Sequence, residues 1–300
     1  MKPKLNRRNI KDRMFKGVTF FSILAVLGVL FGIIIKIFLE GWWHLTPYFI
    51  FTSEAQHPGL GGAIGNAVVG TLMLAVFSTV LATPFAVGTA IYLKKYVKNE
   101  RIKRYFSFFI DVLSGTPSIV LGIFGLLFFA YYLRFVTNGL SLISAVVALA
   151  ILILPVIERA TEEAIDTVPT ELEDASYALG ASKWNTIKGV TIPYATDGIL
   201  TGIVLSAGRA AEESAVVILT AGYTQFMPKL DIVHSDELIF GSSFLPFHES
   251  VAALPITIYN AFRYPHMISP SEGFAASFVI IVIVILINAG ARMIAAWHRK

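Results

Sequence analysis

Six long apolar runs constrain the fold of this 300-residue chain more than any other feature. A helix needs about 20 consecutive apolar residues to cross the hydrocarbon core of a bilayer. Only 15% of the residues are charged, against about 25% in a typical soluble domain, and the charges cluster between the runs. The sequence therefore predicts an all-α integral membrane protein with six transmembrane helices, at residues 17–38, 63–93, 106–133, 141–157, 194–222 and 273–295.

The distribution of lysine and arginine predicts the orientation of these spans. Nineteen of the 24 basic residues lie in the leader 1–16, in the links 94–104 and 158–193, and at the C-terminal end (Arg292, Arg299 and Lys300). Because lysine and arginine accumulate on the cytoplasmic side, we expect both termini to be cytoplasmic and the link 223–272 to be external. Basic clusters can also bind nucleic acid. These clusters flank spans and lack interleaved aromatics, so we expect membrane lipid around the chain and no nucleic acid.

Two of the predicted spans allow another interpretation. Run 17–38 follows a basic leader, as a signal peptide would, but it is longer than the usual apolar region and no small-x-small cleavage site follows. We therefore expect a retained first span. The second run contains Pro84, which removes a helical hydrogen bond, so that helix either ends near Pro84 or bends there.

Cysteine is absent, which excludes a disulfide framework and a thiolate metal site.

The link 158–193 is the longest basic-side link, and its pattern predicts order. Thr170 followed by Glu173 has the spacing of a capping box at a helix start, and Gly180 suits the left-handed residue that ends a helix. A second short helix is expected from about Ser182 to Lys188. The small apolar face of this helix–Gly–helix segment would either lie on the lipid surface or fit a groove on a cytoplasmic partner.

The spacing within this link resembles the coupling-loop signature of ABC importer permeases. That signature is Glu-Ala-Ala, three residues, Gly, nine residues, Ile-x-Leu-Pro. The chain keeps every spacing, as Asp174-Ala175-Ser176, Gly180 and Val190-Thr191-Ile192-Pro193.

The resemblance extends over residues 63–295. GNAVVGTL (65–72), LSGTPSIVLGIFGLL (113–127), residues 158–184, GILTGIVLSAGRAAEESA (198–215) and LPITIYNAF (254–262) together look like the PstA-type permease subunit of phosphate-specific ABC importers. These belong to the binding-protein-dependent transport inner-membrane component family. The fifth span of that family usually reads Arg-Ala-x-Gly-Glu-Thr, whereas here Glu212 replaces the Gly and Ser214 replaces the Thr.

The resemblance implies a type I ABC importer permease fold with a cytoplasmic coupling helix, in the inner membrane. It implies import of inorganic phosphate, a second homologous permease subunit, two ATP-binding subunits that hold ATP-Mg, and an extracytoplasmic phosphate-binding protein. This chain itself would hold no cofactor. The link 223–272 would cap the spans or present a docking surface for the binding protein. The residues expected to contact the ATPase are Asp174, Ala175, Ser176, Leu179 and Gly180.

A charged patch inside the fifth apolar run is the strongest candidate site. Arg209, Glu212 and Glu213 together cost roughly 8–10 kcal/mol near the centre of a lipid-facing helix, more than the surrounding Val, Ile and Leu return. Both acids have helical spacing that would let them reach the guanidinium. The small residues of this run, including the pair Gly198 and Gly202, favour close helix packing. The patch is therefore either a structural ion pair or part of the transport route, where one Glu is protonated or further cations come from elsewhere.

Arg159, at the end of the fourth run, is a second candidate. It lies in register with an arginine of the resembling family and would contact the anion near the exit, or snorkel to the interface as many arginines do. Asp111 in the third run is expected to cap or pair locally.

The chain contains no G-x-x-x-x-G-K-[ST] loop, so the energy of transport would come from another subunit. No zinc pattern and no nucleophile–base arrangement are present, which disfavours an enzyme. Two alternatives remain: a permease for another oxyanion such as phosphonate, sulfate or molybdate, and an ATP-independent channel or receptor.

Overall fold

The structure is a computed structural model that describes residues 7–57, 60–234, 238 and 242–298. Residues 1–6 of the basic leader, together with Arg299 and Lys300, lie outside the described residues. By length and composition, five of the described helices can cross a membrane, or six if one strongly bent pair counts as a span. This agrees with the six spans expected from the sequence.

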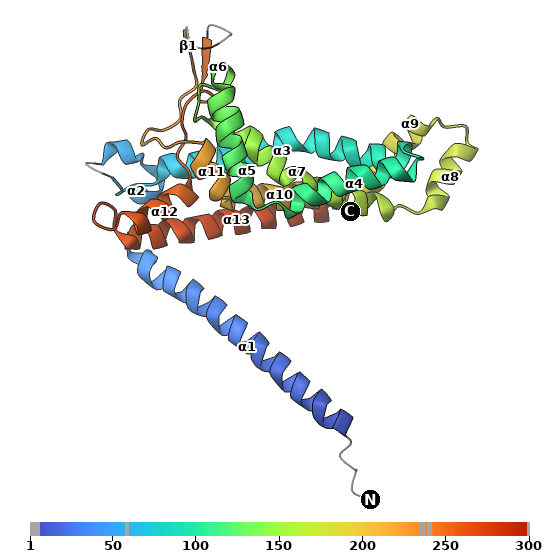
Figure 1. Cartoon of the computed structure of the whole chain (residues 1–300), viewed down its shortest axis with the longest axis horizontal. Coiled ribbons are helices and arrows are strands. Elements are labelled where there is room, and N and C mark those ends of the chain that lie inside the picture. Colours follow the sequence, from blue (N-terminus) through green and yellow to red (C-terminus); the bar gives the residue numbers. More distant parts are fainter. Residues whose placement is uncertain (1–6, 58–59, 235–237, 239–241, 299–300) are drawn as a thin grey trace, which may run out of the picture.

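Four long helices form the body of the protein, lying side by side in Figure 1. They are α3 (Gly65–Ile91), α7 (Leu142–Asp166), α10 (Ile192–Glu212) and α13 (Pro270–His298). Helix α7 packs against both α3 and α10, and 67% of its most apolar stretch is buried by the rest of the chain. Helix α3 continues through Pro84 without ending there.

Close packing between α7 and α10 depends on small residues. A Cβ on Gly198 would lie 2.5 Å from the Cβ of Ala164, and a Cβ on Gly202 would lie 2.4 Å from the Cβ of Ala160. Neither position has room for a side chain. The glycine pair predicted to allow close approach of two helices therefore does so.

Short elements cover the two ends of this bundle (Figure 1). At one end lie η1 (Trp42–His44), α2 (Pro47–Phe51), η2 (Glu54–Gln56) and α12 (Leu254–Arg263). At the other end lie α8 (Thr170–Ala178) and α9 (Lys183–Thr186). Single π-helical turns, η3 (Tyr92–Tyr96) and η5 (Ile187–Thr191), extend α3 and precede α10 at that same end.

The first span, α1 (Arg7–Gly41), leaves the bundle at an angle (Figure 1). None of its most apolar stretch is buried by this chain. It meets α13 closely at Gly41, where a Cβ would lie 2.8 Å from the backbone nitrogen of Ala275. An apolar helix of this length without cover in its own chain needs lipid or another subunit around it.

The third predicted span, 106–133, is not one straight helix. Helix α4 (Glu100–Gly115) ends before Pro117, and α5 (Ser118–Gly125) continues at 95° to it, followed by the π-helical segment η4 (Leu126–Tyr132) and α6 (Arg134–Thr137). Thr116 is extended, with φ −73° and ψ 128°, because the ring of a following proline disfavours the helical conformation. Helix α4 lies along α7, while α5 packs on α11.

The fifth predicted span, 194–222, is also broken. Helix α10 ends at Glu212, Glu213 leaves the helical region with ψ 120°, and α11 (Ala215–Thr220) begins after Ser214. The run has no proline or glycine at this point, so the sequence pattern predicted continuity and was wrong here.

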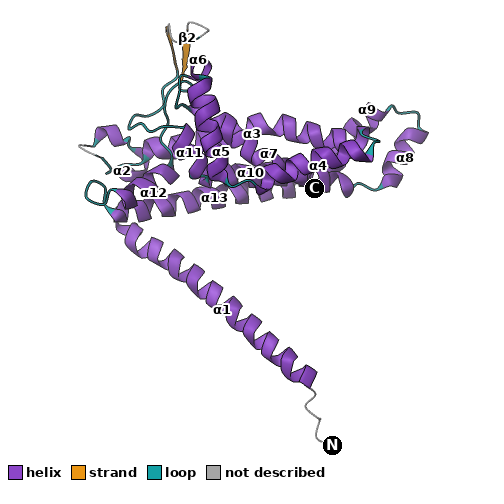
Figure 2. Cartoon of the chain, in the orientation of Figure 1, coloured by secondary structure: helices purple, strands orange, loops and turns teal. Residues whose placement is uncertain are grey.

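The link 223–272 contains a hairpin that the sequence analysis did not predict (Figure 2). Strand β1 (Asp231–His234) pairs antiparallel with β2 (Ser242–Leu245), with Asp231 opposite Leu245. The hairpin projects from the α12 half of the bundle, beside α6 (Figures 1 and 2).

Candidate functional site

The charged patch lies at the break between α10 and α11. Arg209 is in the last turn of α10, where the negative end of the helix dipole favours a cation. Arg209 and Glu212 are exposed and Glu213 is half-buried. The three groups are therefore at a helix end within the apolar run, on a surface that the described chain leaves uncovered.

The expected ion pairs within the patch do not form. Among the described residues, no carboxylate lies within 4.0 Å of the Arg209 guanidinium. Arg209 and Glu213 are four residues apart, but their side chains do not lie on one helix face because the helix ends at Glu212. Glu213 instead accepts a hydrogen bond from the backbone N–H of Ala215 at 3.1 Å, which satisfies one of the free N–H groups at the start of α11.

An exposed stripe, mostly polar but including Leu205, runs along α10 from this patch toward the α8 end. Tyr194, Thr201, Leu205, Arg209 and Glu212 are all exposed and recur at the three- and four-residue spacing of one helix face. Most of the opposite side of α10 is covered by α3, α7 and α13. Arg209 and Glu212 therefore lie at the end of this exposed face that is farthest from α8.

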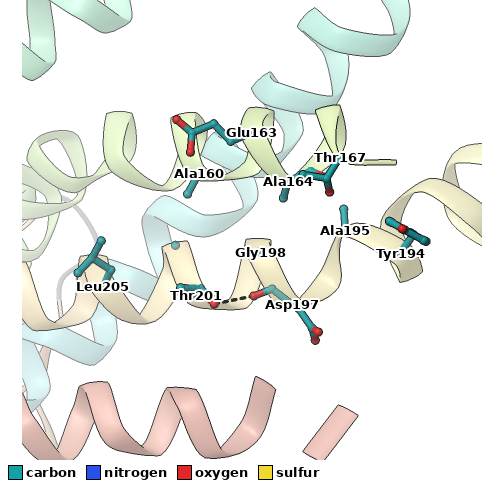
Figure 3. A pocket seen from close by; sticks show the side chains of 11 residues that line it. Ala160, Glu163, Ala164, Thr167, Tyr194, Ala195, Asp197, Gly198, Thr201 and Leu205 are labelled. Carbon is teal, nitrogen blue, oxygen red and sulfur yellow. Dashed lines mark hydrogen bonds between the residues drawn. The ribbon is translucent and has the colours of Figure 1, made fainter. Parts of the chain in front are cut away.

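The part of this stripe nearest α8 borders a groove of about 670 Å³ between α7 and α10. Figure 3 shows Ala160 and Ala164 projecting from α7 toward α10, with Gly198 opposite. The groove exists because these small residues leave space beside the helix contact. Glu163 and Asp197 also line it, and Thr201 donates to the backbone oxygen of Asp197 at 2.7 Å (Figure 3).

Arg159 occupies a different place from Arg209. Its guanidinium donates to Asp111 at 2.6 Å and to Glu162 at 2.9 Å, and more weakly to the backbone oxygen of Ser107 at 3.4 Å. The expected local pairing of Asp111 is confirmed. Arg159 thus ties α7 to α4, with its charge already matched by carboxylates, while its role as an anion contact stays a prediction.

Glu158, beside Arg159, is fully buried, and neither of its carboxylate oxygens has a hydrogen-bond partner. Its Oε2 lies 4.0 Å from Nε of Arg159, too far for a hydrogen bond. No sequence pattern identified this residue as unusual, because its burial depends on the packing of α7 within the bundle.

The helix–Gly–helix segment forms as expected, with one correction. Helix α8 ends at a left-handed Gly180 with φ +84°, whose N–H donates to the oxygen of Tyr177. Ser182 caps α9 by accepting from the N–H of Asn185. The predicted capping box is wrong, because Pro169 precedes α8 without a side-chain cap and Glu173 points elsewhere.

The predicted contact residues of α8 divide into two faces. Asp174, Ala175 and Leu179 are exposed, and Leu179 is 90% exposed. Ser176 faces the other way and lies 2.9 Å from the hydroxyl oxygen of Thr186. A single exposed apolar side chain does not by itself mark an interface, so contact of this face with an ATPase stays a prediction.

Glu173 shares the inner face of α8. Its Oε1 accepts from Nζ of Lys95 at 2.6 Å and from the hydroxyl of Thr191 at 2.5 Å. Burial alone would raise the pKa of Glu173, but these two donors lower it below its usual value of 4.5. Sequence reasoning missed this contact because the partners lie 78 and 18 residues away.

A second polar cluster holds the α12 end together. Glu54 is 3% exposed; it accepts from the hydroxyl of Tyr223 and, at 2.8 Å, from the N–H of Gly61. Burial and the bond to Glu54 raise the pKa of Tyr223. Asn66 donates to the oxygen of Thr224 at 2.8 Å. These contacts fasten the 53–66 segment to the chain that follows α11.

Comparison with known proteins places these features in a family. The binding-protein-dependent transport system inner membrane component family matches residues 82–300. The phosphate transport system permease protein PstA 1 of Mycobacterium tuberculosis (strain H37Rv) is 33% identical over 296 residues, covering 98% of this chain and 90% of that protein. The probable ABC transporter permease protein YqgI of Bacillus subtilis (strain 168) is 32% identical, covering 95% of each.

Solved structures agree on the fold. A bacterial ABC transporter involved in the import of the acidic polysaccharide alginate aligns with a TM-score of 0.67 at 14% identity, covering 97% of both chains. The MetNI methionine ABC transporter, in an inward-facing conformation, aligns with a TM-score of 0.58 at 17% identity, covering 79% of this chain and 94% of that one. The chain belongs to the binding-protein-dependent transport system inner membrane component family and is a multi-pass, non-catalytic permease of an ABC importer.

Proposed function

We propose that this chain is the transmembrane permease subunit of an ATP-driven importer of inorganic phosphate. The observation that carries the proposal is the 33% identity to the PstA 1 phosphate permease over 98% of the chain. The α8 end of the bundle is cytoplasmic in this proposal, and the α12 end is external, which follows from the distribution of lysine and arginine. Both termini are then cytoplasmic.

The proposed route for the anion follows the exposed stripe of α10. Arg209 supplies a fixed positive charge at the end of that stripe farthest from α8, and the groove beside Thr201 and Leu205 leads toward the cytoplasm. A helix break in the membrane is tolerated where it borders protein or a water-filled cavity, which suits a route at this point. The described chain supplies only one side of such a route.

The charge of the patch bears on the cargo. Arg209 with two ionised glutamates would carry a net charge of −1 and would repel an anion. A second homologous permease chain, packed against the uncovered face of α10, is proposed to contribute further positive charge. Phosphate keeps an O–H donor near neutral pH, whereas sulfate has none, so a carboxylate acceptor at Glu212 or Glu213 would favour phosphate.

The outward face of α8 is proposed to dock an ATPase subunit. Asp174, Ala175, Leu179 and Gly180 form that surface, while Ser176 holds the helix from behind. The proposed assembly contains two ATP-binding subunits, which hold ATP-Mg, and an extracytoplasmic phosphate-binding protein at the α12 end. Closure of the ATPase subunits would move α8 and, through it, the membrane helices.

The replacement of a family glycine by Glu212 favours a second candidate, a permease for another oxyanion such as phosphonate, sulfate or molybdate. An additional carboxylate beside the route changes the set of acceptors that the cargo meets. Membership in the ABC importer family leaves no reason to retain an ATP-independent channel.

Reconstitution tests the proposal. The complete complex, in proteoliposomes with its binding protein, is expected to take up radiolabelled phosphate only when ATP is supplied. Excess unlabelled sulfate, molybdate or phosphonate should not compete. Arg209→Ala should abolish uptake with the complex still assembled, and Arg209→Lys should retain part of it. ATP-dependent uptake of another oxyanion without phosphate uptake would overturn the proposed cargo and leave the transporter assignment intact.

A further inference from the structure

Helix α8 is attached to the bundle in an unusual way. None of its residues is buried, so α8 has no fully buried apolar side chain to anchor it. The inner face of α8 makes polar side-chain contacts: Ser176 with Thr186, and Glu173 with two partners. These hydrogen bonds and one ion pair therefore help to fix the position of α8 relative to the membrane helices.

Glu173 is the centre of these contacts. A single oxygen, Oε1, accepts from both Lys95 Nζ and Thr191 Oγ1. The side chains of Lys95 and Glu173 are 19% and 14% exposed, and Thr191 is fully buried. A charge-assisted hydrogen bond with this little solvent is stronger than a surface ion pair.

Both partners of Glu173 lie in π-helical turns. Lys95 is in η3, which ends the long helix that begins as α3, and Thr191 is the last residue of η5, which leads into α10. Single π turns often occur at functional sites within helices. Glu173 thus connects α8 to the ends of two membrane helices that are remote from each other in sequence.

We infer that Glu173 is a positioning residue that makes α3 and α10 move together when α8 is displaced. Through Thr191, α8 acts on α10, which carries Arg209 and the proposed route. Through Lys95, the same displacement reaches α3, which packs on α7 and α10. This inference rests on the proposed docking of an ATPase at α8, and it does not depend on which anion is carried.

The test compares transport with ATP hydrolysis in the complete reconstituted complex. Glu173→Ala and Lys95→Met are each expected to lower the number of anions imported per ATP by about fivefold or more, the lower end of typical coupling between sites. The rate of ATP hydrolysis should be the same as in the native complex, and the ATPase subunits should still copurify. The exchange Lys95→Glu with Glu173→Lys restores the ion pair and should recover part of the ratio.

A neighbouring ion pair supplies the matched control. Lys94 Nζ lies 2.7 Å from Asp166 Oδ2, next to Lys95 in the chain, but Asp166 belongs to α7 rather than α8. Asp166→Asn removes an ion pair of similar length without touching α8. Asp166→Asn should leave the number of anions imported per ATP unchanged. That result would show that the effect of Glu173→Ala does not come from the loss of a charge at this end of the bundle in general.

A distance measurement gives an independent readout. Because the chain has no cysteine, spin labels can be placed at Glu171→Cys on α8 and Lys98→Cys beyond η3 without removing native thiols. In the complete complex we expect one narrow distance distribution with native Glu173 and a broad one with Glu173→Ala. The labelled pair with Asp166→Asn should stay narrow.

Three outcomes would overturn the inference. One is an unchanged import-to-ATP ratio in both Glu173→Ala and Lys95→Met. Another is loss of ATPase subunits from the Glu173→Ala complex, since Glu173 would then support docking rather than transmission. The third is a failure of the charge exchange to recover any of the ratio. If the native complex imports an oxyanion other than phosphate, only the proposed cargo is overturned. The number of anions imported per ATP would then be measured with that oxyanion.

Discussion

The guanidinium of Arg159 lies 2.6 Å from Asp111, and this ion pair joins α7 to α4 just before the chain turns by 95° into α5. Glu162 accepts from the same guanidinium, and fully buried Glu158 lies beside it without a hydrogen-bond partner. One arginine therefore faces three carboxylates at one end of the bundle. This excess of acid suggests that Glu158 weakens the fold and that Arg159 stabilises it.

Replacement of Glu158 by Leu is accordingly expected to raise the unfolding temperature of the purified permease. A buried polar group without a partner costs about 1–3 kcal/mol, and leucine, which has a similar volume, leaves no polar atom unpaired. Thermal unfolding in detergent measures the change. Glu163→Leu, the same substitution at an exposed position of the same helix, is the control and should change stability by no more than about 0.5 kcal/mol. A lower unfolding temperature for Glu158→Leu would indicate that its carboxylate is needed.

Gly202→Ala is expected to destabilise the contact between α7 and α10. The added Cβ would lie 2.4 Å from the Cβ of Ala160, so the two helices must separate, at a typical cost of about 1–3 kcal/mol for overpacking. Gly88→Ala in α3 is the control, because a Cβ there meets nothing within 4 Å and alanine favours a helix. Equal unfolding temperatures for the two variants would contradict the packing described here.

The attachment of α8 is expected to depend on pH only in acid. Lys95 and Thr191 hold the pKa of Glu173 below its usual value of 4.5. A carboxyl group with a lowered pKa contributes its full stability above the pKa of the unfolded chain and loses it as the pH falls through the folded-state value. The spin-label distance between positions 171 and 98 should therefore stay narrow down to about pH 4.5 and broaden below it. In Glu173→Gln the same distance distribution should show no such transition. If the distribution of the native chain already broadened before the pH had fallen to 6, a group other than Glu173 would be responsible.

Much of this architecture follows from apolar patterning. The number of spans, the close approach at Gly198 and Gly202, and the left-handed Gly180 were predictable because each depends on local composition or on one backbone conformation. The bend at Pro117 was within reach of the sequence, since a proline restricts the residue before it. The break after Glu212 was not, because neither proline nor glycine marks it.

The contacts that hold the site together were less predictable. Glu173 has the spacing of a capping residue, and only the folded chain brings Lys95 and Thr191 to it. Arg209 and Glu213 have the spacing of a helical ion pair, but that geometry exists only where the helix continues. In both cases the local rule failed because tertiary structure supplied a different partner or ended the element.

The helix break makes Glu213 a sharper test of anion selectivity than its sequence position suggested. Glu213→Gln keeps an oxygen that can accept from the N–H of Ala215 at the start of α11, but it removes the negative charge. If the carboxylate accepts the O–H of phosphate, this variant should import phosphate more slowly and discriminate less against sulfate, by about tenfold for one lost charged hydrogen bond. Glu213→Ala removes both the charge and the hydrogen bond to Ala215, so it should additionally lower the unfolding temperature. Competition uptake assays with labelled phosphate and labelled sulfate, in the complete complex, measure selectivity. Unchanged phosphate uptake and unchanged selectivity in Glu213→Gln would restrict Glu213 to capping α11 and leave Arg209 as the anion contact of the patch.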